Sequence, residues 1–572
     1  MNSSKFFFLI LSIFIFSPIL ANAQEPLKQE PIFNVEPSFD SQGKNEITAV
    51  LINTSRTAYW YLDSRVSQTP EINSALDSLS QEFEENIYPT MTKAFGSEWT
   101  PGIDKDTRIT ILFHLMKEKK GGYFRSADEY PRIQIPNSNE KEMVYLNSQN
   151  LIAGNIKSLL AHELTHLITF NQKDKKYGIS EDVWLNEGRA EYAPTLLGYD
   201  QDYEGSYLQK RVRDFLNQPS NSLTEWRDFP EDYGAANLFI QYFVDHYGIQ
   251  ILSDSLRIPK TGIGSINAVL IANGFKEDFS QVFVNWSIAV LINDCKISDK
   301  YCYFNANLKN IRIIPLLNYL PTVGPSTLSV VNTTKDWSGN WHRFIGGDGT
   351  LELDFRATAG SFFRVPYVLE GRNGDFQINF LGLDKQGNGK LTVDDFNSKN
   401  IALTIIPIVQ NKISDFSGLE SPRSFSWSAS TRKEEEEAIP SLSPELKPIS
   451  QMTREEIMAR IFEIQNLIIR LQAQLAGLTG SGVSCREIIQ NLYFGMKDNF
   501  QVRCLQEFLK SQGGEIYPEG FVNGNFYALT QKAVIRFQEK YASEILVPVG
   551  ESIGTGYVGP STRAKINRLL TK

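Results

Sequence analysis

The segment from residue 161 to residue 192 reads AHELTHLITFNQKDKKYGISEDVWLNEGRAEY. His162 and His166 are four residues apart, so on an α-helix they project from the same face, where two imidazoles can bind one metal ion. Glu163 is rotated by about 100° from His162 around that helix. Its carboxylate is therefore expected beside the metal, where it can accept a proton from a water molecule. This H-E-x-x-H spacing predicts a catalytic zinc site.

A catalytic zinc needs a third protein ligand and one open position. Glu187 is the best candidate, and Glu191 lies one helical turn further along the same face. Ligating imidazoles usually donate their second N–H to a carboxylate, and Glu191 is placed for that role. The alternative is an ordinary amphipathic helix with surface His and Glu pairs, but the chain has only 5 His in 572 residues. We therefore predict one zinc ion per chain, bound by His162, His166 and Glu187.

The residues that follow the motif narrow the class of zinc protein. Metzincins carry Gly and His three and six residues after the second His. Here Thr169 and Gln172 occupy those positions, which excludes that class. The chain resembles the gluzincins, the thermolysin-like and aminopeptidase-like peptidases whose third ligand is a Glu in an N-E-G-x-A-E context. The resemblance implies that Glu187 is the ligand and that Asn186 and Glu191 support the site.

Aminopeptidases of that group carry a G-x-M-E-N strand that binds the free amine of the substrate. The corresponding stretch, residues 142–147, reads EMVYLN and lacks this signature, so an endopeptidase acting on protein or peptide substrates is favoured. Over about residues 45–315 the chain resembles the hyicolysin-like secreted metallopeptidases, through GGYF (121–124), EMVYLN and WLNEG (184–188). The 142–147 stretch is interpreted either as an edge strand to which a peptide adds or as a buried core strand.

The expected mechanism is that of a zinc peptidase. Zinc lowers the pKa of a bound water toward ~7 and polarises the scissile carbonyl. Glu163 is the predicted general base, which later passes the proton to the leaving amine. The oxyanion needs a further donor, which gluzincins often supply as Tyr or His from a later helix. Tyr233 begins such a helix and is the predicted donor, with His246 near its end as the alternative; an ordinary packing role stays open for both.

The length and net charge of the chain indicate how many domains it has and which partners it lacks. At 572 residues the chain is too long for one compact core and should hold about three or four domains. The net charge of -9 does not indicate a basic surface that could bind nucleic acid, so no nucleic-acid partner is expected.

The first residues are typical of an export signal. Lys5 precedes an apolar run from residue 6 to residue 20, and Ala21-Asn22-Ala23 has the form of a signal-peptidase site. We predict a signal peptide over 1–23, cleaved after Ala23, and a secreted or cell-envelope location. The alternative is an uncleaved anchor, but ~15 apolar residues are short for a span of ~20.

The four cysteines fall into two close pairs. Four cysteines allow three connectivities. Pairing within each domain, as Cys295–Cys302 and Cys485–Cys504, is the economical choice in an oxidising compartment. Free buried thiols are the alternative.

The predicted fold class is a multidomain one. Residues 24–44 are interpreted as a linker and 45–317 as an α+β, two-lobed zincin-type peptidase domain with the cleft between the lobes. Within it we predict a helix that starts at Thr69-Pro70, a strand over 108–113 and the zinc helix over about 150–170.

From residue 318 to residue 432 the pattern changes to short strands broken by Gly and Asn, which predicts a β-sandwich. The segment from Asp384 to Asp395 superficially resembles a calcium loop. Its third position is Gln, its twelfth is Asp, and its flanks are strands, so a hairpin turn is favoured and calcium is not expected.

Residues 433–452 are a charged, Pro- and Ser-rich linker. A helix is predicted over 453–479, with Thr453 and Glu456 as a capping box. Its apolar residues alternate four and three apart, which is a heptad pattern at the minimum length for a coiled coil. It is interpreted either as a homodimerisation element or as a spacer.

The last part of the chain, residues 484–572, resembles the peptidoglycan-binding domain of many cell-wall enzymes. The resemblance implies a small three-helix unit that binds the cell wall, with loop residues Asn523, Asn525, Tyr527 and Tyr557 near sugar or peptide stems. A helical module for protein contacts is the alternative. The matching positions are Leu505, Gln506, Leu509, Gly520, Gly524, Phe526, Thr530, Ala533, Val534, Phe537, Gln538, Val558, Gly559 and Thr562.

These observations together predict an exported zinc endopeptidase that is anchored to the cell wall by its C-terminal domain. Two alternatives stay open, a peptidoglycan hydrolase and a non-catalytic envelope-binding protein on a protease fold. The complete set of His162, Glu163, His166 and Glu187 argues against the second of them.

Overall fold

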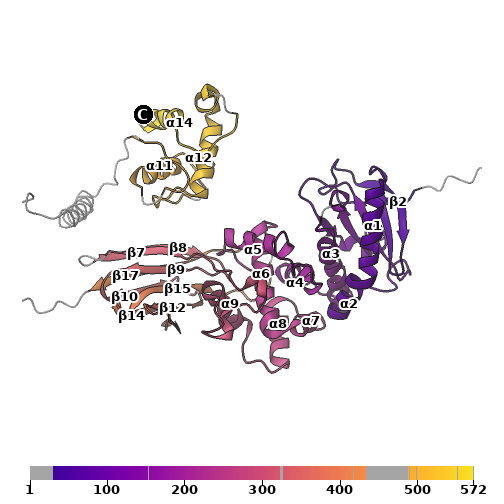
Figure 1. Cartoon of the computed structure of the whole chain (residues 1–572), viewed down its shortest axis with the longest axis horizontal. Helices are drawn as coiled ribbons and strands as arrows, with labels where there is room; N and C mark the ends of the chain where they lie inside the picture. Colours follow the sequence, from indigo (N-terminus) through magenta and orange to yellow (C-terminus); the bar gives the residue numbers. More distant parts are fainter. Residues whose placement is uncertain are drawn as a thin grey trace, which may run out of the picture. The chain divides into compact units, whose positions relative to one another are not determined.

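A computed structural model describes residues 30–152, 154–321, 326–416 and 418–432, and in the C-terminal part 487–488, 490–496, 499–518, 520–549 and 552–570. The predicted signal peptide, the 433–452 linker, the 453–479 helix and Cys485 of the predicted Cys485–Cys504 disulfide lie outside the described residues. The chain divides into two compact units, Met1–Glu436 and Glu437–Lys572 (Figure 1). Among the described residues, no helix has both the length and the apolar character needed to span a membrane.

The N-terminal lobe contains a mixed six-stranded sheet in the order β1-β2-β3-β4-β6-β5. β3, β4 and β6 run parallel to one another, whereas β2 pairs antiparallel with β3 and β5 pairs antiparallel with β6 at the outer edge. The strands are β1 (Ile32–Asn34), β2 (Glu46–Thr54), β3 (Ala58–Asp63), β4 (Ile109–His114), β5 (Gly122–Phe124) and β6 (Met143–Asn147). β1 falls inside the stretch interpreted as a linker and pairs with β2, so Ile32–Asn34 of that stretch belong to the sheet.

The position of β6 decides between the two interpretations of residues 142–147. β6 lies between β4 and β5, and all its residues are buried. The edge-strand interpretation is therefore wrong and the core-strand interpretation is correct. The edge of the sheet on this side belongs to β5, the strand that carries the GGYF segment, and β1 forms the opposite edge.

Helices cover one face of this sheet, and neighbouring residues of a strand contribute to different cores because their side chains alternate between the two faces. Ile111 of β4 and Val144 of β6 share a core with these helices, whereas Leu112 and Tyr145 face a second, smaller core. As predicted, the first helix begins at Pro70 with Thr69 as its N-cap. The helices and helical turns are α1 (Pro70–Glu82), η1 (Phe83–Ile87), α2 (Tyr88–Phe95) and α3 (Ile156–Phe170).

Helix α3 starts later than predicted because the residues before it form a separate turn. The Asn147 side chain accepts a hydrogen bond from the Gln149 amide and opens a short turn over Ser148–Asn150. α3 then continues as a wider turn, η4 (Asn171–Lys175). The helical lobe follows, with α4 (Val183–Leu196), α5 (Tyr207–Asn217), α6 (Pro230–Tyr247), α7 (Ile249–Leu256), α8 (Gly262–Ala272) and α9 (Phe279–Ile292). After α9, Cys295 and Cys302 form a disulfide.

The β domain consists of two mainly antiparallel sheets that share one core, and β7 is the exception because it runs parallel to β9. One sheet has the order β8-β17-β10-β14 and the other β7-β9-β15-β12-β13, and a single residue pair, Phe396 and Asn400, joins them. Phe344 of one sheet meets Trp427 of the other, with ring centroids 4.7 Å apart. The strands are β7 (Leu316–Leu320), β8 (Ser326–Thr334), β9 (His342–Gly346), β10 (Gly349–Ala357), β11 (Phe363–Arg364), β12 (Pro366–Gly371), β13 (Phe376–Phe380), β14 (Asn388–Phe396), β15 (Asn400–Ile405), β16 (Ile408–Val409) and β17 (Arg423–Arg432).

The segment with calcium-loop character is a turn that leads into β14. Asp384 Oδ1 accepts hydrogen bonds from the backbone amides of Gln386 and Asn388, both at 2.8 Å. Gly387 takes a positive φ of 81° there. The carboxylate thus closes its own turn, as short polar side chains commonly do.

The β domain packs directly on the helical lobe. Trp337 is buried against Phe279 and Phe283 of α9, with ring centroids 4.9 and 5.6 Å apart. The Trp341 indole donates to the Ser287 carbonyl at 2.9 Å. The segments 45–317 and 318–432 therefore lie in one compact unit rather than in two separate ones.

The C-terminal unit is helical, with a small core of its own. Buried Gln506 donates to the Asn525 carbonyl and the Thr530 hydroxyl, and accepts from the Gly524 amide. Gln538 repeats the arrangement with Tyr557, Thr562 and Gly556. These glutamines hold two equivalent turns in place, and their side chains are not exposed to a ligand. The helices are α11 (Phe500–Ser511), α12 (Ala528–Lys540), α13 (Ala542–Ile545) and α14 (Pro560–Leu570).

Two carboxyl groups, Glu129 and Glu142, are buried in the N-terminal lobe. Burial raises the pKa of Glu129 above its ordinary value of 4.5, the charge of Glu142 adds to the shift, and Lys175 opposes it. Burial also raises the pKa of Glu142. The folded chain therefore holds protons that the unfolded chain releases above about pH 5. This contribution to the free energy of unfolding is complete below pH ~4.5 and is lost as the pH rises through the raised folded-state pKa.

Glu129→Gln should reduce this loss of stability at high pH, because an amide side chain does not ionise. We expect the variant to melt roughly 2–5 °C above the wild type at pH 9 and close to it at pH 5. Scanning calorimetry at both pH values measures this, with Glu46→Gln at an exposed carboxylate as the matched control. A variant that melts at or below the wild-type temperature at pH 9 would contradict the assignment.

Candidate metal centre

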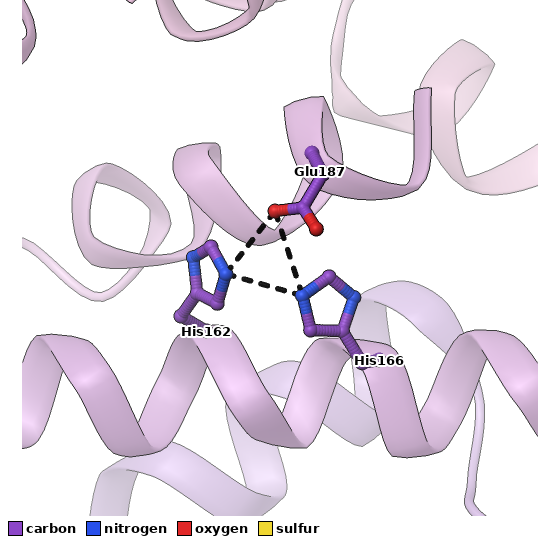
Figure 2. Close-up of side chains that lie close together, drawn as sticks. All are labelled: His162, His166 and Glu187. Atoms are coloured by element: carbon purple, nitrogen blue, oxygen red, sulfur yellow. Dashed lines mark hydrogen bonds and ion pairs between the residues drawn. The ribbon is translucent and has the colours of Figure 1, made fainter. Parts of the chain in front are cut away.

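The predicted ligands converge on one point between two helices (Figure 2). His162 and His166 project from the same face of α3, and Glu187 reaches toward them from α4. The two Nε2 atoms are 3.1 Å apart, and Oε2 of Glu187 is 3.3 Å from His162 Nε2 and 3.6 Å from His166 Nε2. These three residues could therefore hold one metal ion.

This geometry fits zinc. A tetrahedral zinc with bonds of about 2.0–2.1 Å spaces its ligand atoms roughly 3.3 Å apart, close to the distances found here. Oε2 of Glu187 is buried without a hydrogen-bond donor, which a metal ion would satisfy. Burial acts to raise the pKa of Glu187, but His166 and His162 outweigh it, so the net pKa is lowered and the carboxylate stays ionised.

Glu191 lies behind His162 rather than among the ligand atoms. Its Oε1 is 3.4 Å from Nδ1 of His162, the ring nitrogen that faces away from the site. Arg211 of α5 binds both carboxylate oxygens, at 2.6 and 2.8 Å, and the Tyr207 hydroxyl donates to Oε1 at 2.9 Å. Glu191 is completely buried, so these partners satisfy both of its carboxylate oxygens and fix its orientation toward His162.

Glu163 lies beside the ligands, against the free edge of the sheet. A Cβ on Gly122 of β5 would come within 2.9 Å of the Glu163 side chain and 2.7 Å of the Tyr145 carbonyl, so this position requires glycine. Burial raises the pKa of Glu163 to about 8; His162 opposes the shift, and Glu187 and Glu191 add to it. A carboxyl group with this pKa can accept and return a proton near neutral pH.

A cleft of about 580 Å³ opens over these side chains. It is lined by His162 and Glu163, by the loop before β5, and by Tyr207 and Tyr233 from the helical lobe. Burial and the nearby charge of Glu187 raise the pKa of Tyr233 well above its ordinary value of 10. Tyr233 therefore keeps its hydroxyl proton at neutral pH and can donate it in the cleft.

The other two predicted site residues differ in their placement. Asn186 lies close enough to His166 to act against the lowering of the His166 pKa by burial, but no hydrogen bond joins them, because Asn186 Oδ1 and His166 Nδ1 are both buried without a partner. His246 is not brought to the cleft. Its Nε2 lies 2.9 Å from the Cys302 carbonyl, near the disulfide.

Sequence reasoning missed Tyr207, Arg211 and Asp228. Tyr207 and Arg211 are four residues apart on α5, so they share a helix face, and this spacing was the available signal. Asp228 lies in the turn before α6 and has a positive φ of 61°. The sequence does not indicate this conformation, except that Asp adopts positive φ more readily than most residues.

Asp40, Asp63 and His114 form a second group of possible ligands in the described part of the chain. Arg65 binds both carboxylates, at 2.5 Å to Asp40 and 2.6 Å to Asp63. The guanidinium already supplies the positive charge there. Burial lowers the pKa of His114 to about 4, with Asp40 and Asp63 opposing, so the imidazole is neutral.

Comparison with known proteins supports the metalloprotease part of the predicted resemblance. The chain is 29% identical over 278 residues to the neutral metalloprotease ShpI of Staphylococcus hyicus. The match covers 43% of this chain and 59% of that relative, so the chain spans less than two thirds of the relative's length. No protein-family model matches the chain. The gluzincin class and the C-terminal resemblance stay predictions.

The solved structures that match this chain are only distantly similar to it. A periplasmic inhibitor of g-type lysozyme from Aeromonas hydrophila is 9% identical, with a TM-score of 0.15, and covers 20% of this chain and 98% of its own. The pre-peptidase C-terminal domain of a Bacillus anthracis collagenase is 8% identical, with a TM-score of 0.14, and covers 20% and 96%. Both TM-scores are too low to bear on fold or function.

Proposed function

We propose that the chain is an exported zinc-dependent endopeptidase of the gluzincin type. The observation that carries the proposal is the convergence of His162, His166 and Glu187 on one point, with Glu163 beside them in the same cleft. The similarity to a neutral metalloprotease supports it. The predicted signal peptide and the disulfide between Cys295 and Cys302 are consistent with export.

Different residues of the chain have different roles in the proposed peptide hydrolysis. Zinc, when bound, supplies Lewis acidity that activates water and polarises the scissile carbonyl. His162, His166 and Glu187 would hold the ion, and Glu191 orients His162. Glu163 accepts the proton of the attacking water at its carboxylate and passes it to the leaving amine. Tyr233 keeps its proton on Oη, from which it donates to the oxyanion.

The free edge of the sheet is the proposed binding surface for the substrate backbone. β5 has β6 on one side only, and Gly122 brings its backbone next to Glu163. An extended peptide that adds to β5 would form backbone hydrogen bonds there and lie across the catalytic carboxylate. This mode of binding suits an endopeptidase, because it requires no free chain end.

Incubation of the full chain with casein and with purified wall sacculi tests the proposal. We expect zinc-dependent cleavage of casein, its loss with a chelator, and no release of peptidoglycan fragments. Sacculus hydrolysis without casein cleavage would instead identify a peptidoglycan hydrolase. Binding without any hydrolysis would identify an envelope-binding protein.

Cell-wall anchoring is the proposed role of the C-terminal unit. Its resemblance to peptidoglycan-binding domains supports this, and Tyr527 and Tyr557 are 38% and 43% exposed at equivalent turns. Aromatic side chains at such turns offer apolar faces to sugar rings. The proposed role of the predicted helix over 453–479 is that of a dimerisation element or a spacer.

Truncation after Arg432 should leave casein cleavage unchanged and abolish retention on wall material, because the division into two units falls directly after β17. Sedimentation with purified sacculi compares the full chain with the truncated one. Equal sedimentation of both forms would place attachment in the N-terminal unit and refute the proposed role of the C-terminal unit.

A further inference from the structure

The ring of Tyr233 is held on two sides. The Arg211 guanidinium lies over its face, 4.6 Å from the ring centroid. Trp226 meets the same ring at a centroid distance of 4.8 Å and an interplanar angle of 74°. Because Arg211 also binds Glu191, the ring is coupled to the residue that orients His162.

The hydroxyl end of Tyr233 has a different partner. It donates a hydrogen bond of 2.5 Å to Oδ1 of Asp228. Asp228 has a φ of 61°, a left-handed conformation that Asp and Asn tolerate better than most residues. Such backbone outliers cluster at functional sites, where the surrounding structure stabilises them.

Asp228 also reaches across the cleft. Its Oδ2 lies 3.8 Å from Nζ of Lys120, which belongs to the loop before β5 on the opposite wall. Both side chains line the same cleft as Glu163 and Tyr233. The Lys120 and Asp228 side chains are 38% and 60% exposed, so solvent competes with this ion pair and it adds little to stability.

We propose that Asp228 is a positioning residue that aims the Tyr233 hydroxyl into the cleft, with Lys120 as its counter-ion on the opposite wall. This inference rests on the proposed peptidase function. Tyr233 has a single hydroxyl proton, so its bond to Asp228 belongs to the resting enzyme and is exchanged when the hydroxyl donates to the substrate. Arg211 and Trp226 fix the ring, and Asp228 fixes the end that reacts.

Two substitutions separate the hydrogen bond from the charge. Glycine adopts the left-handed backbone conformation readily, so Asp228→Gly removes only the carboxylate that accepts the Tyr233 hydrogen bond. The kcat on casein-derived peptides should fall about tenfold, and KM should stay within about twofold of wild type. Asp228→Asn keeps an acceptor oxygen and the tolerance for positive φ, so it should recover most of that loss. Asp395, an exposed residue with φ 55° in the β domain, provides the matched control as Asp395→Gly, which should leave kcat unchanged.

The Tyr233→Phe background tests whether Asp228 acts through the hydroxyl. Tyr233→Phe alone should lower kcat by about 10²-fold. Adding Asp228→Gly should then cost nothing further, because the partner is already absent. Lys120→Gln should lower kcat only about twofold, since the exposed ion pair is weak.

Binding of a phosphinic peptide, whose oxygens mimic the tetrahedral oxyanion, gives a readout without turnover. Calorimetry on zinc-loaded protein should show about tenfold weaker binding for Asp228→Gly than for wild type, and near wild-type binding for Asp228→Asn. Unchanged kcat and binding in Asp228→Gly, equal losses in both variants, or a further loss in the Tyr233→Phe background would each overturn the positioning role. A wild-type protein that binds the phosphinic peptide and cleaves nothing would refute the proposed function alone.

Discussion

Glu163→Gln is expected to keep the fold and the zinc while turnover falls by about 10²–10⁴-fold, the usual contribution of a general base. The reason is that an amide of nearly the same shape cannot accept the proton of the attacking water. Glu163 is buried against Gly122 of the edge strand and lines the cleft beside the predicted ligands. Single-turnover cleavage of a quenched peptide, with zinc measured in the same samples, tests this prediction.

The matched control is Glu118→Gln. Glu118 lines the same cleft but does not belong to the group around the ligands, and it is exposed. This control should stay within about twofold of wild type. Wild-type rates in Glu163→Gln, with zinc in place, would exclude Glu163 as the base.

Glu187→Ala is expected to weaken zinc binding more than any other single change at acidic residues of the site. It removes one of three protein ligands, so zinc affinity should fall more than about 100-fold. Glu191→Ala should cost only about 10 to 100-fold, as is typical of residues that orient a ligand. Competition with a chromophoric chelator measures both affinities.

The comparison needs a control for folding, because Glu191→Ala leaves Arg211 buried without a partner for much of its charge. Breaking a buried pair in this way can cost about 3–5 kcal/mol. Glu191→Gln keeps an acceptor for Arg211 and should melt closer to wild type. If a folded Glu191 variant loses its zinc while Glu187→Ala retains it, the roles of the two carboxylates are reversed.

The pairing of site residues on each helix follows from the sequence because it depends on local geometry, whereas the resemblance to gluzincins indicated that Glu187 meets the two histidines. His162 and His166 share a helix face by their spacing alone, and Glu187 and Glu191 do so on the next helix. The start of α1 at Thr69-Pro70 is also a local signal, because it needs only a cap and a proline at the first turn.

Features that depend on long-range contacts were not predictable in this way. β5 has three residues, too few to show an alternating pattern, and which strand forms the edge is set by the order of the whole sheet. β1 is equally short and was interpreted as part of a linker. Arg211 is charged and would be expected on the surface, yet it is buried because Glu191 is its partner.

Anomalous diffraction at the zinc absorption edge, from crystals of the full chain grown with zinc, tests the central claim most directly. The account predicts one peak per chain at about 2.0–2.2 Å from Nε2 of His162, Nε2 of His166 and a carboxylate oxygen of Glu187. Both oxygens of Glu191 should lie beyond bonding distance. A peak at Asp40, Asp63 and His114 instead, or no peak in crystals of protein that cleaves casein, would contradict the account.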